Sequence, residues 1–143
     1  MDRRIAVLKT VAACETFAEN ARDRGADDLA DQARQRAVQL RAQAHGAKTE
    51  VERECLEAVH AYEEILTSRR GKRQPASRTW QMIRRLGILP AVERVVTKTH
   101  ESSGYTELVK MGLKDYSFEA VILRHPESSS EEARARSRER MNR

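Results

Sequence analysis

Residues 49–70 read TEVERECLEAVHAYEEILTSRR, and this stretch decides the fold. Its acidic first half and its two final arginines match the positive N-terminal end and the negative C-terminal end of a helix dipole. Apolar residues recur every three or four positions, which is the spacing of one face of an α-helix, at Val51, Cys55, Ala58, Tyr62 and Ile65. The stretch therefore predicts a long amphipathic helix over residues 49–68.

Two more amphipathic helices are predicted upstream of it. Residues 2–24 form the first, with Asp2 as its cap, Gly25 as its stop, and an apolar stripe made of Val7, Leu8, Val11, Cys14, Phe17, Ala18 and Ala21. The second begins at Asp27 or Asp28, ends before Gly46 and carries the stripe Leu29, Ala33, Ala37, Leu40 and Ala44. Short glycine turns between long helices imply antiparallel neighbours. Residues 1–70 therefore predict a three-helix antiparallel unit.

Downstream, residues 71–127 predict a basic loop followed by short helices. Gly71 and Pro75 interrupt the helical pattern, so residues 71–76 are expected to form a loop. Ser77 is expected to cap a helix that runs to Leu86, and Gly87 separates it from a helix that ends near residue 99. Helix, glycine break and helix give a helix-turn-helix-like outline, which any pair of antiparallel helices shares.

The last part of the chain predicts three more helices. After a polar turn at residues 101–104, one helix covers residues 105–111, and a second begins at a capping Asp115 and stops before Pro126. The short apolar run 121–123 also fits a buried strand, but the cap and the proline favour a helix. Serines and glutamates at residues 128–132 begin a charged C-terminal helix over residues 128–143, which has few core residues and is expected to fray at its end.

Composition places these elements in one all-α domain covering residues 1–143. With 4% aromatic residues against 34% charged ones, the core must come from Ala, Val, Leu and Ile. Cys14 and Cys55 lie on the apolar stripes of separate helices, where we expect free buried thiols rather than a disulfide. No stretch approaches the length of a membrane span, so a cytoplasmic protein without membrane contact is expected.

The stretch from residue 69 to residue 92 points to a function, because it holds seven Lys or Arg residues and no Asp or Glu. The rest of the chain is nearly balanced, with net charges of −3 over residues 1–68, −1 over 93–130 and +2 over 131–143. Closely spaced cations gain affinity for a nucleic acid by releasing counterions from its phosphates. The expected phosphate contacts of this basic block are Arg69, Arg70, Lys72, Arg73, Arg78, Arg84 and Arg85.

Four neighbouring residues extend this candidate site. Ser77 and Thr79 lie in the first turn of the predicted helix, where they are placed to hold a phosphate, and Gln81 shares the side of the arginines. Trp80 either packs in the core or stacks on an unpaired base, and the scarcity of aromatic residues favours the core. The alternative for the whole block is a solvated surface whose positive charges balance the acidic residues of the third predicted helix.

The sequence contains no catalytic or cofactor motif. Glu57, His60 and Glu64 share a face of the third predicted helix, and Glu-x-x-His is half of the ligand set of a di-iron bundle, but the other half is missing. The other three histidines lie at predicted helix ends, where an imidazolium favours the dipole without any chemistry. We therefore expect no metal and no cofactor, and enzymatic activity has no positive support.

Several stretches resemble a group of small uncharacterised bacterial proteins. They are residues 61–64 (AYEE), 76–83 (ASRTWQMI), 104–105 (GY), 118–121 (FEAV) and 123–126 (LRHP). The resemblance covers roughly the C-terminal two-thirds of the chain and implies a bacterial source. It implies no activity and therefore adds no mechanism to the charge pattern.

Two functions follow as expectations. The leading one is a non-catalytic nucleic-acid-binding protein, with DNA favoured over RNA, that contacts phosphates through the basic loop and the helix after it. The alternative is a protein–protein adaptor or an oligomeric assembly component, which docks a partner through the alanine-lined helices or the charged C-terminal helix. A nuclease would need clustered carboxylates beside the basic block, and the block contains none.

Overall fold

A computed structural model of the chain describes residues 1–98 and 104–142. This part of the chain is helical throughout, without a strand, so the all-α single domain is confirmed. The α-helices are α1 (Arg3–Ala6), α2 (Val11–Asp23), α3 (Asp27–Gln43), α4 (Glu50–Arg70), α5 (Ser77–Leu86), α6 (Ile88–Lys98), α7 (Tyr105–Lys110), α8 (Phe118–Arg124) and α9 (Glu131–Met141). Two short 3-10 turns are η1 (Lys114–Tyr116) and η2 (Pro126–Ser128).

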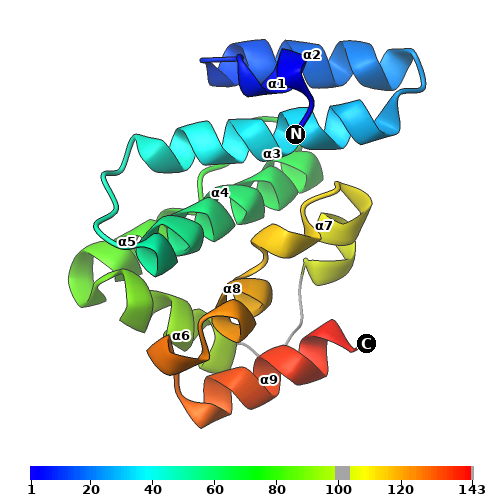
Figure 1. The fold of residues 1–143 in the computed structure, drawn as a ribbon. Helices are drawn as coiled ribbons and strands as arrows, with labels where there is room; N and C mark the ends of the chain where they lie inside the picture. The colour runs from blue at the N-terminus through cyan, green and yellow to red at the C-terminus, as the bar shows by residue number, and fades with distance from the viewer. Residues whose placement is uncertain (99–103, 143) are drawn as a thin grey trace.

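The helices are stacked in layers around α4 (Figure 1). α2 packs on α3 and α3 packs on α4, each antiparallel to the one before, which confirms the predicted N-terminal three-helix unit. On the opposite side of α4 lie α6, α8 and α9, while α5 and α7 lie toward its two ends. The chain therefore places α4 between two sets of helices.

Local sequence closes both ends of α4. The Thr49 backbone is extended, and its Oγ1 accepts a hydrogen bond from the Glu52 amide at 3.2 Å, as an N-cap does. Gly71 ends the helix with φ at +81°, a conformation that glycine adopts readily. Every residue from 54 to 61 is buried, so α4 is covered around most of its circumference, and not on one stripe alone.

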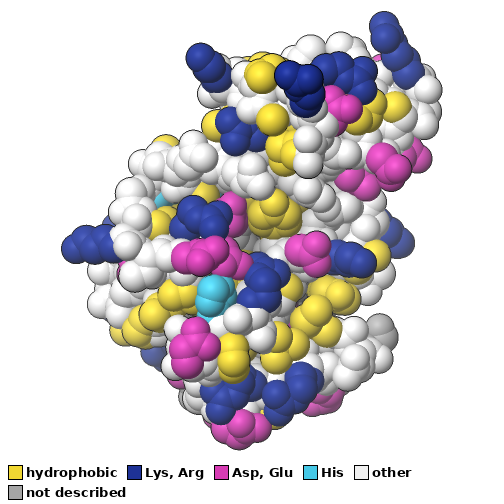
Figure 2. All heavy atoms as spheres, in the orientation of Figure 1, with side chains coloured by type: hydrophobic (Ala, Val, Ile, Leu, Met, Phe, Trp, Pro, Cys, Tyr) yellow, Lys and Arg dark blue, Asp and Glu magenta, His cyan; other side chains and the backbone are white. Residues whose placement is uncertain are grey.

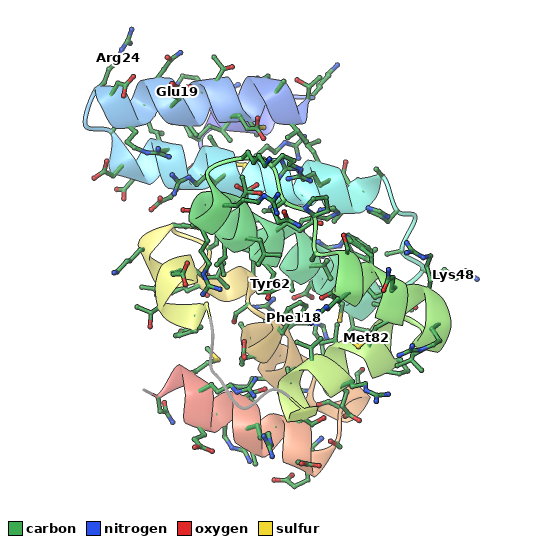
Figure 3. The ribbon with its side chains drawn as sticks, turned by 180° about the vertical axis from the view of Figure 1, so that it is seen from behind. Glu19, Arg24, Lys48, Tyr62, Met82 and Phe118 are labelled. Carbon is green, nitrogen blue, oxygen red and sulfur yellow. The ribbon has the colours of Figure 1, made fainter. Side chains whose placement is uncertain are left out.

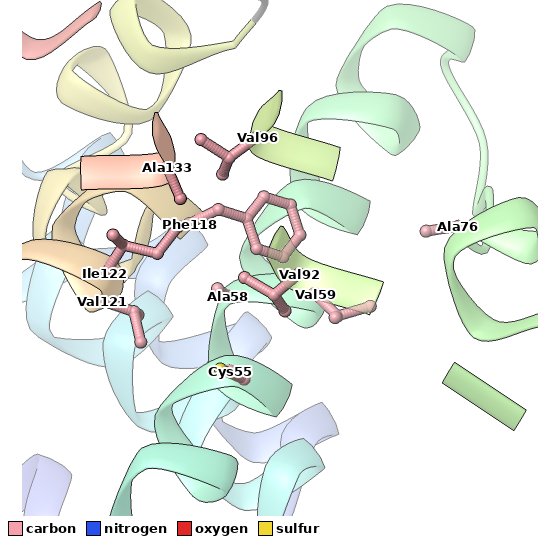
Figure 4. Close-up of a cluster of buried hydrophobic side chains, with 10 residues drawn as sticks. All are labelled: Cys55, Ala58, Val59, Ala76, Val92, Val96, Phe118, Val121, Ile122 and Ala133. Carbon is pink, nitrogen blue, oxygen red and sulfur yellow. The ribbon is translucent and has the colours of Figure 1, made fainter. Parts of the chain in front are cut away.

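The main core lies where α4, α6, α8 and α9 meet (Figure 4). The ring of Phe118 is surrounded by small aliphatic side chains from the other three helices, including Val92, Val96, Ala58 and Ala133. A smaller cluster of alanines joins α2 to α3. As composition predicts, the core consists mostly of Ala and Val, and both cysteines are buried and free.

The prediction of one helix over residues 2–24 is wrong, because this stretch forms two helices, α1 and α2. The side chain of Arg36 donates from Nε to the Leu8 carbonyl at 3.1 Å, and Thr10 caps α2 by accepting from the Ala13 amide at 3.1 Å. Val7, which was assigned to the apolar stripe, is 69% exposed as a result.

Two predicted caps are also wrong. Ser77 lies inside the first turn of α5, whose N-cap is Ala76, and α5 has no side-chain cap. Asp115 lies in η1, and Ser117 caps α8 instead by accepting from the Ala120 amide at 3.0 Å. Ser117 has the extended backbone that an N-cap requires, which explains why the helix begins after it.

The C-terminal helix is more embedded than its sequence suggests. Ser130 caps it as expected, accepting from the Ala133 amide at 3.1 Å. Ala133 is fully buried in the main core, and Ser137 and Arg140 are buried as well. α9 is therefore a docked part of the domain. Of the predicted turn at residues 101–104, only Gly104 lies within the described residues.

α3 approaches the turn after α7 through the backbone of Gly112. Gln35 donates from Nε2 to the Gly112 carbonyl at 3.0 Å. Gly112 has φ at +72°, and a Cβ added there would lie 2.2 Å from Cγ of Asp31. Both the backbone conformation and the close contact therefore require glycine at this position.

Replacing this glycine tests the contact between α3 and the turn. We expect Gly112→Ala to lower the free energy of unfolding by about 3 kcal/mol, because a left-handed backbone and an overlap with Asp31 add together. Gly46→Ala is the matched control, since Gly46 has φ at +64° but nothing within 4 Å of the added Cβ, and it is expected to cost about 1 kcal/mol. Urea unfolding of both variants measures the difference, and equal losses would contradict the proposed overlap.

Candidate nucleic-acid interface

The structure divides the seven cations of the basic block into two groups. The loop after α4 turns back along that helix, and the Ala76 amide donates to Oε2 of Glu63 at 2.8 Å. Glu63 lies seven residues before Arg70, which is about 10 Å of helix. α5 therefore starts beside the middle of α4 and leads away from the C-terminal end of α4.

The first group lies at the end of α4 and in the loop, where most of its members are engaged. Arg69 pairs with Glu107 of α7, and Nη2 of Arg73 lies 3.5 Å from Oε1 of Glu63. Arg70 donates to Oε1 of Gln74 at 2.8 Å. Two of these four cations are thus paired with carboxylates of the chain itself. Only Lys72 has no polar partner in the part of the chain that the structure describes.

The second group lies on α5 and is unpaired. Arg78, Arg84 and Arg85 are exposed, and none has an ion pair or a hydrogen bond with any residue in 1–98 or 104–142. α5 contains no carboxylate, and Gln81 is exposed on it as well. Arg94 of α6 adds a fourth exposed and unpaired guanidinium to the α5–α6 hairpin. Within the basic block, α5 is therefore the helix whose cations all lack a partner among the described residues.

Elsewhere the surface mixes charges of both signs. On the face drawn in Figure 2, Lys and Arg side chains are interspersed with Asp and Glu side chains over most of the molecule. α9 shows the same mixture, since Arg134 and Arg138 both pair with Glu131, at 2.9 and 3.1 Å. Exposed cations without an ion pair also occur elsewhere, for example Arg22 and Arg24, so α5 is distinguished by carrying three of them on one helix that has no carboxylate.

Glu63 is the attachment point of α5, and sequence reasoning missed it. Its side chain is 2% exposed and accepts hydrogen bonds from the Ala76 amide and from Nε1 of Trp80, both at 2.8 Å. His60 lies one turn earlier on α4, with Nδ1 at 3.0 Å from the Glu63 carboxylate. The signal in the sequence is Glu63, three residues after His60 and next to Glu64 of the face formed by Glu57, His60 and Glu64.

Trp80 is partly buried and packs against other parts of the fold. Its ring stacks on His45 with centroids 4.6 Å apart and contacts His60 at 5.2 Å, and it packs against the main core. With its Nε1 donated to Glu63 and one face covered by His45, the indole acts as an anchor for α5. The structure thus places Trp80 in the packing role that its scarcity favours.

Ser77 and Thr79 lie apart from each other. Ser77 is exposed at the first turn of α5, beside the unpaired amides of that turn. Thr79 is 6% exposed and faces the interior, so its hydroxyl is not on the surface with the arginines. Of the two, Ser77 has the position that a phosphate contact needs.

The three residues considered as metal ligands each take a different partner. Glu57 accepts from Nη1 of Arg53 at 3.0 Å, His60 lies against Glu63, and Glu64 pairs with Arg41. Over residues 1–98 and 104–142, no three His, Cys, Asp or Glu side chains come together as a metal site. Within the same ranges, no helix combines the length and the apolar character that a bilayer span requires. No protein-family model, curated protein or solved structure matches the chain.

The electrostatics of Glu63 link this attachment to pH. Burial by itself would raise the pKa of Glu63, but hydrogen bonds from His60, the Ala76 amide and Trp80 outweigh it and lower the pKa from 4.5 to about 2. At any pH above the pKa that Glu63 has in the unfolded chain, the carboxylate is charged in the folded and in the unfolded state. Its contribution to the free energy of unfolding is then complete. As the pH falls from about 4.5 to about 2, the unfolded chain takes up the proton first, so the stabilisation is lost.

Glu63→Gln tests this arrangement without opening a cavity. We expect the free energy of unfolding at pH 7 to fall by about 3 kcal/mol, because buried donors lose a charged acceptor. The difference in the free energy of unfolding between the variant and wild type is expected to shrink as the pH falls from 5 to 2. Urea unfolding at a series of pH values measures it. Glu50→Gln, at an exposed position of the same helix, should change stability by less than about 0.5 kcal/mol. A loss that does not vary with pH would contradict the role of the ionised carboxylate.

Proposed function

We propose that the chain binds the phosphate backbone of duplex DNA through α5, with Arg78, Arg84 and Arg85 as the phosphate contacts. One observation carries this proposal: all three guanidinium groups are exposed on one helix and unpaired within the described residues, on an element without a carboxylate. A cation that is paired with a carboxylate of the chain must break that ion pair before it can bind a phosphate. The three arginines of α5 have no such ion pair to break.

The spacing of these arginines suits a duplex. Arg78 and Arg85 are seven residues apart, two helical turns, and so lie on one side of α5 about 10.5 Å apart along its axis. This distance corresponds to about three base-pair steps at 3.4 Å each along one strand. Trp80 is engaged with Glu63 and His45 and is not available to stack on an unpaired base, which favours a duplex over a single strand.

The first group of cations has a smaller part in this proposal. Arg69 and Arg73 face carboxylates of the chain, and the end of α4 is separated from α5 by the length of the returning loop. Only Lys72 and Arg70 of that group lack a carboxylate partner among the residues described. A binding surface on α5 of three arginines implies weak, strongly salt-dependent association.

Salt titration of DNA binding tests the proposal. With three phosphates neutralised, we expect the logarithm of the binding constant to fall with the logarithm of salt concentration with a slope of about −3. The double variant Arg84→Ala, Arg85→Ala should bring the slope to about −1 and weaken binding at least about tenfold at 0.1 M salt. Fluorescence anisotropy with a labelled 20-base-pair duplex measures both quantities.

A second double variant distinguishes the effect of the position of the arginines on α5 from the effect of the net charge of the chain. Arg22→Ala, Arg24→Ala removes the same charge from exposed positions at the end of α2, across the molecule from α5. We expect this control to keep a slope near that of wild type. Equal effects of the two double variants, or binding indifferent to salt, would refute a specific role for α5.

The adaptor function receives less support from the surface. It calls for a contiguous exposed apolar seam, whereas the large apolar side chains exposed in the described residues are Met1 and Val7 beside α1, Leu86 of α5 and Val109 of α7. The alanines of α2 and α3 that were candidates for docking are used between those two helices. Docking through α2, α3 or α9 remains a prediction that light scattering can test.

A further inference from the structure

A cavity of about 340 Å³ lies beneath α5, between that helix and α4, α6, α7, α8 and α9. Its walls are mostly apolar and include Ile65, Met82, Leu108 and Phe118. Three of the residues that line it are Tyr62 of α4, Met82 of α5 and Phe118 of α8, which are labelled in the view from behind in Figure 3. The walls belong to six helices, α4 to α9, so the cavity is part of the packed fold.

Several polar side chains line this cavity, and four of them have no polar partner among the described residues. Arg78 and Arg94 line it without an ion pair in the described chain, and no described residue bonds the hydroxyls of Tyr62 and Tyr105. The one carboxylate in the wall, Glu119, already accepts from Nη1 of Arg140 at 3.2 Å. The cavity therefore offers two guanidinium donors and two phenol hydroxyls to an anion, with its own acid already neutralised.

The shape and the wall chemistry define the ligand. At roughly 30 Å³ for each water molecule, the volume equals about eleven waters, and it suits an organic molecule of a similar number of non-hydrogen atoms. Three of the six Phe, Tyr and Trp residues of the chain line this one space. Flat aromatic walls favour a ring in offset or edge-to-face contact, and a guanidinium matches a carboxylate in two parallel hydrogen bonds.

We propose that this cavity is a binding site for a small aromatic carboxylate, with its ring against Tyr62, Met82 and Phe118 and its carboxylate on Arg78 and Arg94. Apolar walls with a small number of convergent polar groups are the usual form of a small-molecule site. The site shares Arg78 with the DNA-binding surface proposed for α5, whereas Arg84 and Arg85 do not line the cavity. Either proposal can therefore fail without the other.

Binding of 2-naphthoate to the full chain tests this site, with the neutral 2-naphthamide as a matched probe. Titration calorimetry is expected to give saturable binding of the carboxylate with a Kd below about 1 mM, and at least tenfold weaker binding of the amide. In a methyl NMR spectrum, the resonances of Met82, Ala58 and Leu108 should shift on titration, because these side chains line the cavity. Shifts confined to other methyl groups would refute the assigned location.

Paired arginine variants decide the role of charge. Arg78→Met, Arg94→Met keeps the apolar stems of exposed residues and should weaken 2-naphthoate at least tenfold, while Arg84→Met, Arg85→Met removes the same charge from α5 and should leave its affinity within twofold. Met82→Trp fills the cavity and should abolish binding of both probes. Equal affinity for carboxylate and amide, equal effects of the two arginine pairs, or no saturable binding at 5 mM would each overturn the proposal.

Discussion

The position of α5 depends on one buried carboxylate. Glu63 lies in the middle of α4, and it receives the Ala76 amide at the start of α5 and the indole of Trp80 one turn later. These two bonds fix both the origin and the rotation of α5, because they join two points on successive turns to the same carboxylate. The rotation in turn sends Thr79 and Met82 inward and Arg84 and Arg85 outward.

α4 uses the same device at other positions. Glu54 accepts from Arg124 at 2.7 Å and lies 2.6 Å from a ring nitrogen of His125, which ties the end of α8 to the first half of α4. Glu57, also buried, pairs with Arg53 within α4 itself and so joins no other helix to it. In a chain with few aromatic residues, buried apolar area alone specifies helix positions weakly, whereas a buried charge with a specific partner tolerates little displacement. Paired carboxylates therefore complement the small-residue core in fixing how the helices dock.

Sequence patterns predicted the helices well because helix ends are encoded locally. The third helix begins at Thr49 and the C-terminal helix begins at the serines of residues 128–130, as predicted, and the glycines at 25, 71 and 87 ended their helices as expected. The errors came where tertiary contacts decide. Glu63, distant in sequence, accepts from the Ala76 amide at the start of α5, where Ser77 was expected to cap, and the first helix breaks near the Leu8 carbonyl that accepts from Arg36. The cavity was also beyond sequence reasoning, because its lining residues come from six helices.

The charge pattern of the sequence located the basic block but did not show which of its cations pair with carboxylates. The seven cations are close in sequence but form two groups in the structure. The loop after α4 returns along that helix, so α5 lies away from the arginines at the end of α4. Their chemistry then depends on their neighbours: Arg69 meets Glu107, while α5 has no acid on its own surface. Arg78 belongs both to the exposed face of α5 and to the wall of the cavity beneath it. A carboxylate ligand and a phosphate would compete for that guanidinium, so the two proposed sites, if both are occupied in solution, must be coupled through it.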